Sequence, residues 1–309
     1  MKNVAKRVVV LLSVAGSLGL GAPRVPPSAL VLSEVRSWEL PAQFRVTGGA
    51  FTDDGRAMVW SSGSSYTLLQ EGDRIVPIGK GTVRGPLAAT VRHDTALVVD
   101  SALHAIVAIP VRGGAPTIVP AIWAGVVVEA TPVDDGWLLL AVARTGDLVV
   151  ETLNGFGHVT RTEALSKAFG NVALGQRVTA NWRIATGPTG AVIDHINPPI
   201  TVGAPGSSLP TLLAIVRTDA GLTFNLRLPN WLASPVLTLD DNERLISVAD
   251  LSSDVRLLIR LDSLGQPTHT TAIDTPFGLL ASSTTRKEIM AIRETDRSEV
   301  VIYKYAWKL

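Results

Sequence analysis

Three pairs of neighbouring aspartates are the residues whose type and spacing most suggest chemistry. They are Asp53-Asp54, Asp134-Asp135 and Asp240-Asp241. Paired carboxylates can serve general acid–base catalysis. Each pair, however, falls in an equivalent turn between two apolar stretches, and aspartate favours such turns because its side chain caps its own backbone. The recurrence therefore predicts a structural role in turns for all three pairs.

The other reactive side chains are few and scattered. None of the five histidines has a second histidine at a helical metal-binding spacing. Gly206-Ser207-Ser208 lies in a predicted loop and lacks the strand-to-helix elbow that activates a serine nucleophile. Asp194-His195 is the best polar pair, because it ends a predicted strand and opens into a long loop. We therefore predict no catalytic residues and disfavour serine hydrolysis.

Charge and cysteine content limit the classes of partner and the cellular compartments that fit this chain. Lys and Arg total 28 against 27 for Asp and Glu, and no run of five like charges occurs. The basic surface that a nucleic-acid binder needs is thus missing, and we predict no nucleic-acid partner. With no cysteine, the chain can form no disulfide and no thiolate metal site. A bacterial exported protein held together by core packing fits this composition best.

The N-terminus has the pattern of an export signal. Lys2, Lys6 and Arg7 precede an apolar stretch over residues 8–22, and Pro23 follows. The alternative is a retained membrane anchor, because the apolar helix would approach the roughly 20 residues needed to span a membrane if it continued to Val25. We assign residues 1–22 to a signal peptide or retained anchor and residues 23–30 to a linker. The expected location is periplasmic or extracellular, and a retained segment would tether the protein to the membrane through residues 8–22.

Behind this segment, one strand–turn–strand unit recurs six times. The first strand of each pair begins at Ala57, Leu97, Trp137, Ala191, Leu245 and Ile289. A weaker strand precedes each pair and another follows five of them, with glycine or Asn/Asp in the turns, as tight hairpins require. This pattern predicts an all-β fold, a six-bladed β-propeller over residues 31–309.

The sixth unit ends after its third strand, so another segment must complete it. Residues 31–40, with Val35, Trp38 and Leu40, alternate roughly as a strand does. We expect this segment to act as an N-terminal clasp strand that closes the last blade and covers its open edge.

The repeated motifs resemble those of six-bladed β-propellers of the broad bacterial class that includes NHL-type and SMP-30-like repeats. The run from Asp135 to Leu140 and the ends of two second strands, Val98-Val99-Asp100-Ser101 and Val248-Ala249-Asp250, carry the resemblance. Propellers of this class include hydrolases, lyases, ligand sensors and scaffolds. The resemblance therefore implies an architecture and leaves the function open.

A metal-dependent lactonase is the enzymatic alternative that the resemblance implies. An SMP-30-like lactonase would hold a divalent ion in its central channel with a Glu and Asn/Asp set from the inner strands. Glu129 and Asn181 are the candidates here, and the other first strands offer mainly Val, Leu, Ala, Thr and Ser. We therefore predict no cofactor and keep the lactonase-like hydrolase as the alternative.

Departures from the minimal unit indicate a contact surface on one face of blades three to five. They are the loops 163–176, 195–210 and 228–234. The candidate binding residues on this face are Phe169, Asp194, His195 and Trp231. Extra loops on one side of a rigid scaffold are typical of a binding site.

Together these observations favour a non-enzymatic exported propeller that binds another protein or a membrane protein complex. An extrinsic subunit of a membrane complex, such as a photosynthetic reaction centre or antenna, is one form of this role, although no residue indicates that complex. The alternatives are the metal-dependent lactonase-like hydrolase and a sensor for a small ligand or glycan.

Overall fold

The computed structural model divides the chain into two compact units. Unit 1 comprises Met1–Leu40 with Asn230–Leu309, and unit 2 comprises Pro41–Pro229. The structure describes residues 29–123, 125–133, 136–164, 181–187, 190–196, 211–217, 221–228, 231–233, 237–239, 243–250, 256–261, 267–273, 277–294 and 297–308. The predicted N-terminal helix over residues 8–22 lies outside this part. Among the described residues, no helix is long and apolar enough to span a membrane.

Unit 2 holds four antiparallel sheets of four strands, each in the chain order of a simple meander. The first two sheets contain β2 (Gly48–Phe51), β3 (Ala57–Trp60), β4 (Thr67–Glu71), β5 (Arg74–Ile78), and β6 (Pro86–Arg92), β7 (Thr95–Asp100), β8 (Ala105–Pro110), β9 (Thr117–Pro120). The next two contain β10 (Val126–Val133), β11 (Gly136–Val142), β12 (Leu148–Asn154), β13 (Val159–Ala164), and β14 (Asn181–Gly187), β15 (Gly190–Ile196), β16 (Thr211–Arg217), β17 (Gly221–Leu228).

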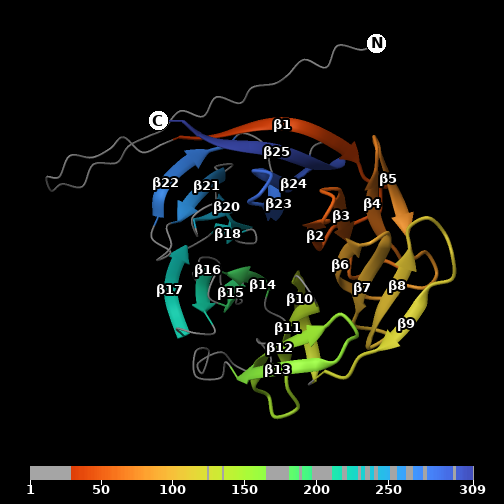
Figure 1. The fold of residues 1–309 in the computed structure, drawn as a ribbon. Helices are drawn as coiled ribbons and strands as arrows, with labels where there is room; N and C mark the ends of the chain where they lie inside the picture. The colour runs from red at the N-terminus through yellow and green to blue at the C-terminus, as the bar shows by residue number, and fades with distance from the viewer. Residues whose placement is uncertain are drawn as a thin grey trace, which may run out of the picture. The chain divides into compact units, whose positions relative to one another are not determined.

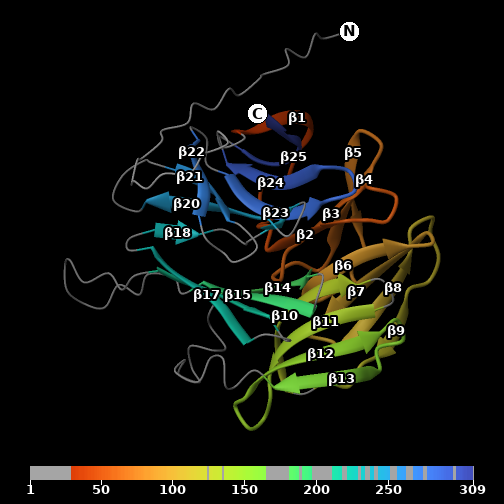
Figure 2. The same cartoon turned by 60° about the vertical axis from the view of Figure 1, so that its left-hand side comes forward.

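Neighbouring sheets of unit 2 meet through their first strands. The strands β2, β6, β10 and β14 contact one another in this order, and Figure 1 shows β5, β9 and β13 on the outer side of their sheets. Burial follows this layout: all four residues of β3 are buried, whereas β13 is largely exposed. Strands packed on both faces read as continuous apolar runs, which is why the inner pairs stand out in the sequence. Figure 2 shows the succession from β10 to β13 in one sheet.

Asp100 shows what the repeated acidic residue at the end of a second strand does. Its side chain is fully buried. The carboxylate accepts hydrogen bonds from the main-chain N–H groups of Arg84 at 2.6 Å, Gly85 at 3.1 Å, and Ala102 and Leu103 at 3.0 Å. It therefore ties the segment before β6 to the turn after β7, and its role is structural.

Unit 1 holds two sheets. One has the strand order β1-β25-β24-β23 and the other the order β18-β20-β21-β22, with β19 also pairing β20. The strands are β1 (Ala29–Glu39), β18 (Trp231–Ala233), β19 (Leu237–Thr238), β20 (Arg244–Asp250), β21 (Arg256–Leu261), β22 (Pro267–Ala272), β23 (Phe277–Ser283), β24 (Glu288–Glu294) and β25 (Ser298–Lys308).

The predicted clasp strand is confirmed. β1 pairs with β25 in antiparallel fashion from Ala29↔Lys308 to Glu39↔Glu299. The first strand of the described chain thus supplies the fourth strand of the last sheet. Leu30, Leu32 and Trp38 on β1 are buried, so the pairing also contributes apolar contacts.

β1 contains a β-bulge at Val35, and the face of the strand that is buried differs before and after it. The register runs from Glu34↔Tyr303 directly to Arg36↔Ile302, which leaves Val35 unpaired. Leu32 lies opposite Tyr305 and Trp38 opposite Val300. Because positions 305 and 300 of β25 face opposite sides, Leu32 and Trp38 do so as well. The extra residue lets β1 bury one face in its first half and the other face in its second half.

The sheet built on β20 departs from the predicted form. Its first strand is split in two, because Trp231–Ala233 pairs with Val248–Asp250 and Leu237–Thr238 pairs with Arg244 and Leu245. The expectation that residues 228–234 form a loop is therefore wrong for Trp231, which begins β18. The described structure has five regular four-stranded blades where six were predicted, and the sixth sheet has five strands.

Candidate functional site

A charged pocket lies in unit 2, at one end of the sheets that contain β2–β5 and β6–β9. Its volume is about 600 Å³, and it is lined by Asp54, Arg56, Glu71, Gly72, Asp94, Val111 and Arg112. These residues belong to the turns between β2 and β3, β4 and β5, β6 and β7, and β8 and β9. In an antiparallel meander these four turns emerge at the same end, which explains why residues up to 58 positions apart meet here.

Arg56 and Asp54 form the first ion pair of the pocket. Arg56 Nε donates to Asp54 Oδ2 at 2.7 Å, and the main-chain N–H of Arg56 and the hydroxyl of Thr52 donate to Oδ1. Partial burial alone would raise the pKa of Asp54, but the hydrogen bonds from Thr52 and Arg56 and the Arg56 charge outweigh it and lower that pKa below its usual value. Asp54 therefore stays ionised and holds Arg56 in place.

Asp94 and Arg112 form the second ion pair, with 3.1 Å between Arg112 Nη2 and Asp94 Oδ2. Asp94 lies at the tip of the β6–β7 hairpin, where both His93 and Asp94 have positive φ, at 45° and 61°. Two consecutive residues with positive φ are the geometry of a tight type I′ hairpin turn. The Asp94 carbonyl accepts a 2.9 Å hydrogen bond from the Val111 N–H, so the hairpin tip is fixed beside Arg112.

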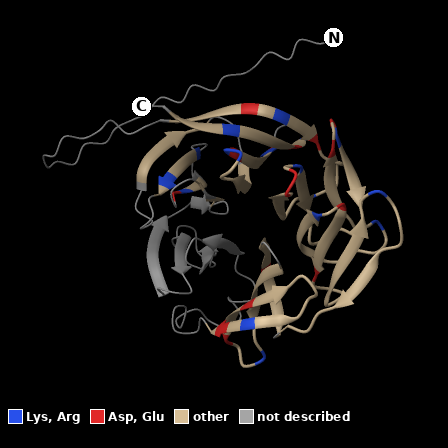
Figure 3. Cartoon of the chain, in the orientation of Figure 1, with Lys and Arg blue, Asp and Glu red and all other residues tan. Residues whose placement is uncertain are grey.

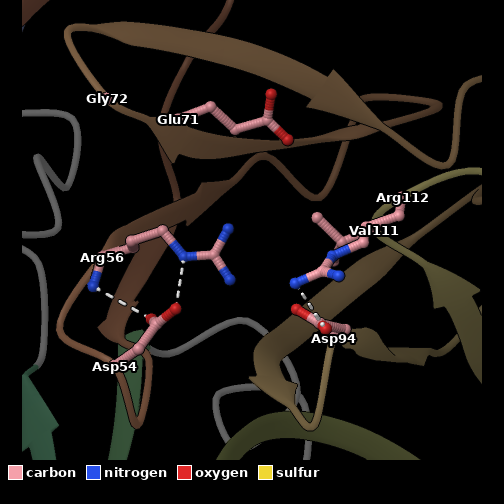
Figure 4. A pocket seen from close by; sticks show the side chains of 7 residues that line it. All are labelled: Asp54, Arg56, Glu71, Gly72, Asp94, Val111 and Arg112. Carbon is pink, nitrogen blue, oxygen red and sulfur yellow. Dashed lines mark hydrogen bonds and ion pairs between the residues drawn. The ribbon is translucent and has the colours of Figure 1, made fainter.

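Glu71 differs from the other two acidic residues of the pocket. Its carboxylate has no ion-pair or hydrogen-bond partner among the described residues, and its side chain is exposed. Figure 4 shows the guanidinium groups of Arg56 and Arg112 pointing toward each other, with Glu71 on one side of the gap and Asp54 and Asp94 on the other. Three carboxylates and two guanidinium groups give the pocket a net charge of −1.

The charges of this pocket belong to a wider pattern. In the described part of the chain, Figure 3 shows Lys, Arg, Asp and Glu at turns and on strands such as β1, β25 and β13, with few on the inner strands of unit 2. Charged turn residues are ordinary in such a fold. The distinctive feature here is that turns of two neighbouring sheets bring both signs of charge to one cavity.

The predicted site residues do not line this pocket. Asp194 and His195 lie in β15, near the end of that strand as predicted, and Trp231 begins β18. Phe169 lies outside the described residues. Glu129 lies in β10 and Asn181 in β14, which are neighbouring first strands. Among the described residues, no group of three or more His, Asp or Glu side chains is placed to hold a metal ion.

The pocket is therefore a site that the sequence analysis missed. The binding role of the loops 163–176, 195–210 and 228–234 stays a prediction. A signal is present at one position of the repeat: Asp54 and Asp94 both lie in the turn between the first and second strands of their units. The predicted capping role of the acidic turns is compatible with the pocket, because Asp54 caps its turn and lines the pocket as well.

Comparisons with known proteins support the fold. No protein-family model and no curated protein matches the chain. Among solved structures, a protein described as a candidate gluconolactonase is 10% identical over 88% of this chain and 93% of its own, with a TM-score of 0.51. YCF48 bound to D1 peptide is 11% identical over 92% of this chain and 99% of its own, with a TM-score of 0.49. Virginiamycin B lyase from Staphylococcus aureus is 11% identical over 88% of this chain and 99% of its own, with a TM-score of 0.45. At 10% identity the likeness to the first of these structures is one of fold, and together with the sheets described above it supports a β-propeller.

Proposed function

We propose that the protein is a non-enzymatic, exported β-propeller that binds another polypeptide, and that the charged pocket of unit 2 is one of its contacts. In this proposal β1 is the clasp that closes the last blade. The protein works in the periplasm or outside the cell, free or tethered to a membrane, and its partner is a protein or a membrane protein complex.

The openness and polarity of the pocket carry the proposal. Sites for small molecules are usually enclosed and mostly apolar. Here Val111 is the single apolar side chain of the lining, and the Asp54 and Arg112 side chains are 56% and 82% exposed. An open pocket of this kind suits a side chain of another polypeptide, because the partner protein then covers it and excludes water.

Two exposed apolar side chains in the same unit support a protein contact. Ile122 is 87% exposed and Phe156 is 72% exposed. The segments that carry them touch, since a Cβ on Gly157 would lie 3.3 Å from the Cβ of Ala121. Large exposed apolar side chains on neighbouring segments are candidates for an interface. The loops with Phe169, Asp194, His195 and Trp231 are a further proposed contact.

Cross-linking in native cells followed by gentle purification tests this function. We expect the wild-type chain to recover a specific partner, and the double variant Glu71→Gln, Arg112→Gln or the variant Phe156→Ser to recover less of it. The matched controls are Asp73→Asn and Arg84→Gln, which change exposed charges that do not line the pocket. Recovery of free monomer alone from wild-type cells would count against the proposal.

Metal analysis of the same protein tests the alternative, a metal-dependent lactonase-like hydrolase. Glu129 and Asn181, on neighbouring first strands, would be its ligands. Stoichiometric divalent metal that is lost in Glu129→Ala and in Asn181→Ala would replace the binding function with the enzymatic one.

A further inference from the structure

We propose that the charged pocket recognises a zwitterionic polypeptide segment, in which a carboxylate side chain seats between Arg56 and Arg112 and a neighbouring basic side chain pairs with Glu71. This inference rests on the proposed function and specifies the chemistry of the ligand.

The donors that remain free in the pocket point to a carboxylate. The Nε–H of Arg56 already donates to Asp54, and the two Nη atoms of that guanidinium have no hydrogen-bond partner among the described residues. Asp94 occupies Nη2 of Arg112, and no described residue bonds the other nitrogens of that group. The two guanidinium groups point toward each other (Figure 4). A planar carboxylate is the group that guanidinium donors bind best, because the two pair through parallel hydrogen bonds.

The acceptor that remains free points to a cation beside that carboxylate. Glu71 has no partner among the described residues and lies across the same gap from Asp54 and Asp94 (Figure 4). An anion alone would sit near the Glu71 charge and be repelled by it, and an amine alone would leave the two guanidinium groups without an acceptor. A segment with one charge of each sign satisfies both, and it adds no net charge to a pocket whose own charge is −1.

The net negative charge of the pocket argues against a phosphate group as its ligand. A phosphate dianion would bring two negative charges into a pocket where three carboxylates already exceed two guanidinium groups. Phosphate sites rely instead on an excess of Arg, Lys or main-chain N–H donors. Inorganic phosphate is therefore expected to compete poorly.

A four-peptide comparison tests the inference. The probes are fluorescently labelled peptides with the central sequences Gly-Glu-Lys-Gly, Gly-Gln-Lys-Gly, Gly-Glu-Gln-Gly and Gly-Gln-Gln-Gly, titrated with the full chain and followed by fluorescence anisotropy. We expect Gly-Glu-Lys-Gly to bind tightest, and each single loss of charge to weaken binding roughly two- to fivefold, the range of exposed ion pairs. Equal binding of all four peptides, or displacement by millimolar phosphate, would overturn the inference.

Variants of the protein assign each charge. Glu71→Gln should remove the preference for Lys over Gln and keep the preference for Glu, and Arg112→Gln should do the reverse. Asp73→Asn and Arg84→Gln should leave both preferences unchanged. If the native partner is captured equally by wild type and the pocket variants while the peptides show no preference, the inference fails and the binding function stands. If no partner is captured at all, the proposed function fails by its own test.

Discussion

Arg293 Nη1 donates a 2.7 Å hydrogen bond to Glu34, a residue 259 positions earlier in the chain. The same guanidinium also binds Glu299 through Nε and Nη2, at 2.9 and 2.6 Å. These contacts raise the pKa of Arg293 above its usual value, chiefly through the hydrogen bond to Glu34. Beside them, burial raises the pKa of Tyr303 and outweighs the opposing effect of Arg293. The clasp strand is thus held by a charged network in addition to its main-chain pairing.

Replacing Glu34 with Gln should weaken this network. Because the side chains of Arg293 and Glu34 are 21% and 31% exposed, we expect the free energy of unfolding to fall by about 0.5–1 kcal/mol. Urea denaturation measures it. Glu39→Gln is the control, because Glu39 and its partner Arg297 are 51% and 71% exposed and should contribute less. A larger effect for Glu39→Gln would contradict the importance of the network.

Inserting a residue beside Val35 should destabilise unit 1 far more than deleting Val35. After the deletion, Leu32 and Trp38 are separated by the same number of residues as their partners Tyr305 and Val300, so both keep their partners and their faces in a regular strand. An alanine inserted between Val35 and Arg36 adds a second unpaired residue or shifts one half of β1 by one position, which turns its side chains to the wrong face. We expect the insertion to cost about 2–4 kcal/mol, the range of a lost large core side chain, and Val35→Ser to cost less than about 0.5 kcal/mol, because Val35 is 48% exposed. Urea denaturation provides the comparison, and a deletion that is more damaging than the insertion would contradict this register.

Asp100→Ala should be among the most damaging single substitutions in unit 2. It would leave the N–H groups of Arg84, Gly85, Ala102 and Leu103 without their acceptor, that of Gly85 in a buried position, which should cost about 3 kcal/mol or more. Asp100→Asn retains one acceptor oxygen and should lie between wild type and Ala. Thermal unfolding gives the order, with Asp73→Asn as an exposed control. An Asn variant less stable than the Ala variant would contradict this account.

His269 should make the protein less stable in mild acid. Burial, and next the charge of Arg260, lower the pKa of His269 in the folded state. Arg260 lies opposite His269 in the sheet and is paired with Glu243. The unfolded chain therefore binds a proton first, so stability falls as the pH drops through the usual histidine pKa of about 6.5.

His269→Gln should reduce this loss of stability between pH 7 and pH 5. Urea midpoints measured across that range provide the comparison. Thr270→Ala, on the same strand and without a titratable group, should keep the wild-type slope. An unchanged slope in His269→Gln would exclude this residue as the source.

The strands were predictable because of their burial. Residues 57–60 and 105–109 are packed on both faces of their sheets, and they appear in the sequence as continuous apolar runs bounded by turn residues. The clasp was predictable from a count, since the sixth unit lacked a fourth strand. The bulge at Val35 and the split of β18 from β19 could not be predicted. Both depend on which neighbouring side chains must be buried, and a single sequence does not show which strands will be neighbours.

The pocket was harder to foresee for a related reason. Asp54 and Asp94 are ordinary turn residues within their own units, and their proximity depends on how two sheets pack. Glu71 and Arg112 stand 41 positions apart in the sequence, and no local pattern distinguishes them from other charged turn residues. The repeat itself was the available clue, because equivalent turns of neighbouring units emerge at the same end of their sheets.

The pairing of β1 with β25 has a consequence for how the chain is made. Its hydrogen-bonding partner β25 is synthesised much later than β1, so β1 must wait with its backbone groups and Leu30, Leu32 and Trp38 unprotected until then. Strand pairing over such a sequence distance is slow, and exposed strands promote misassociation in the meantime. Unit 1 can therefore consolidate only after β25 has been made.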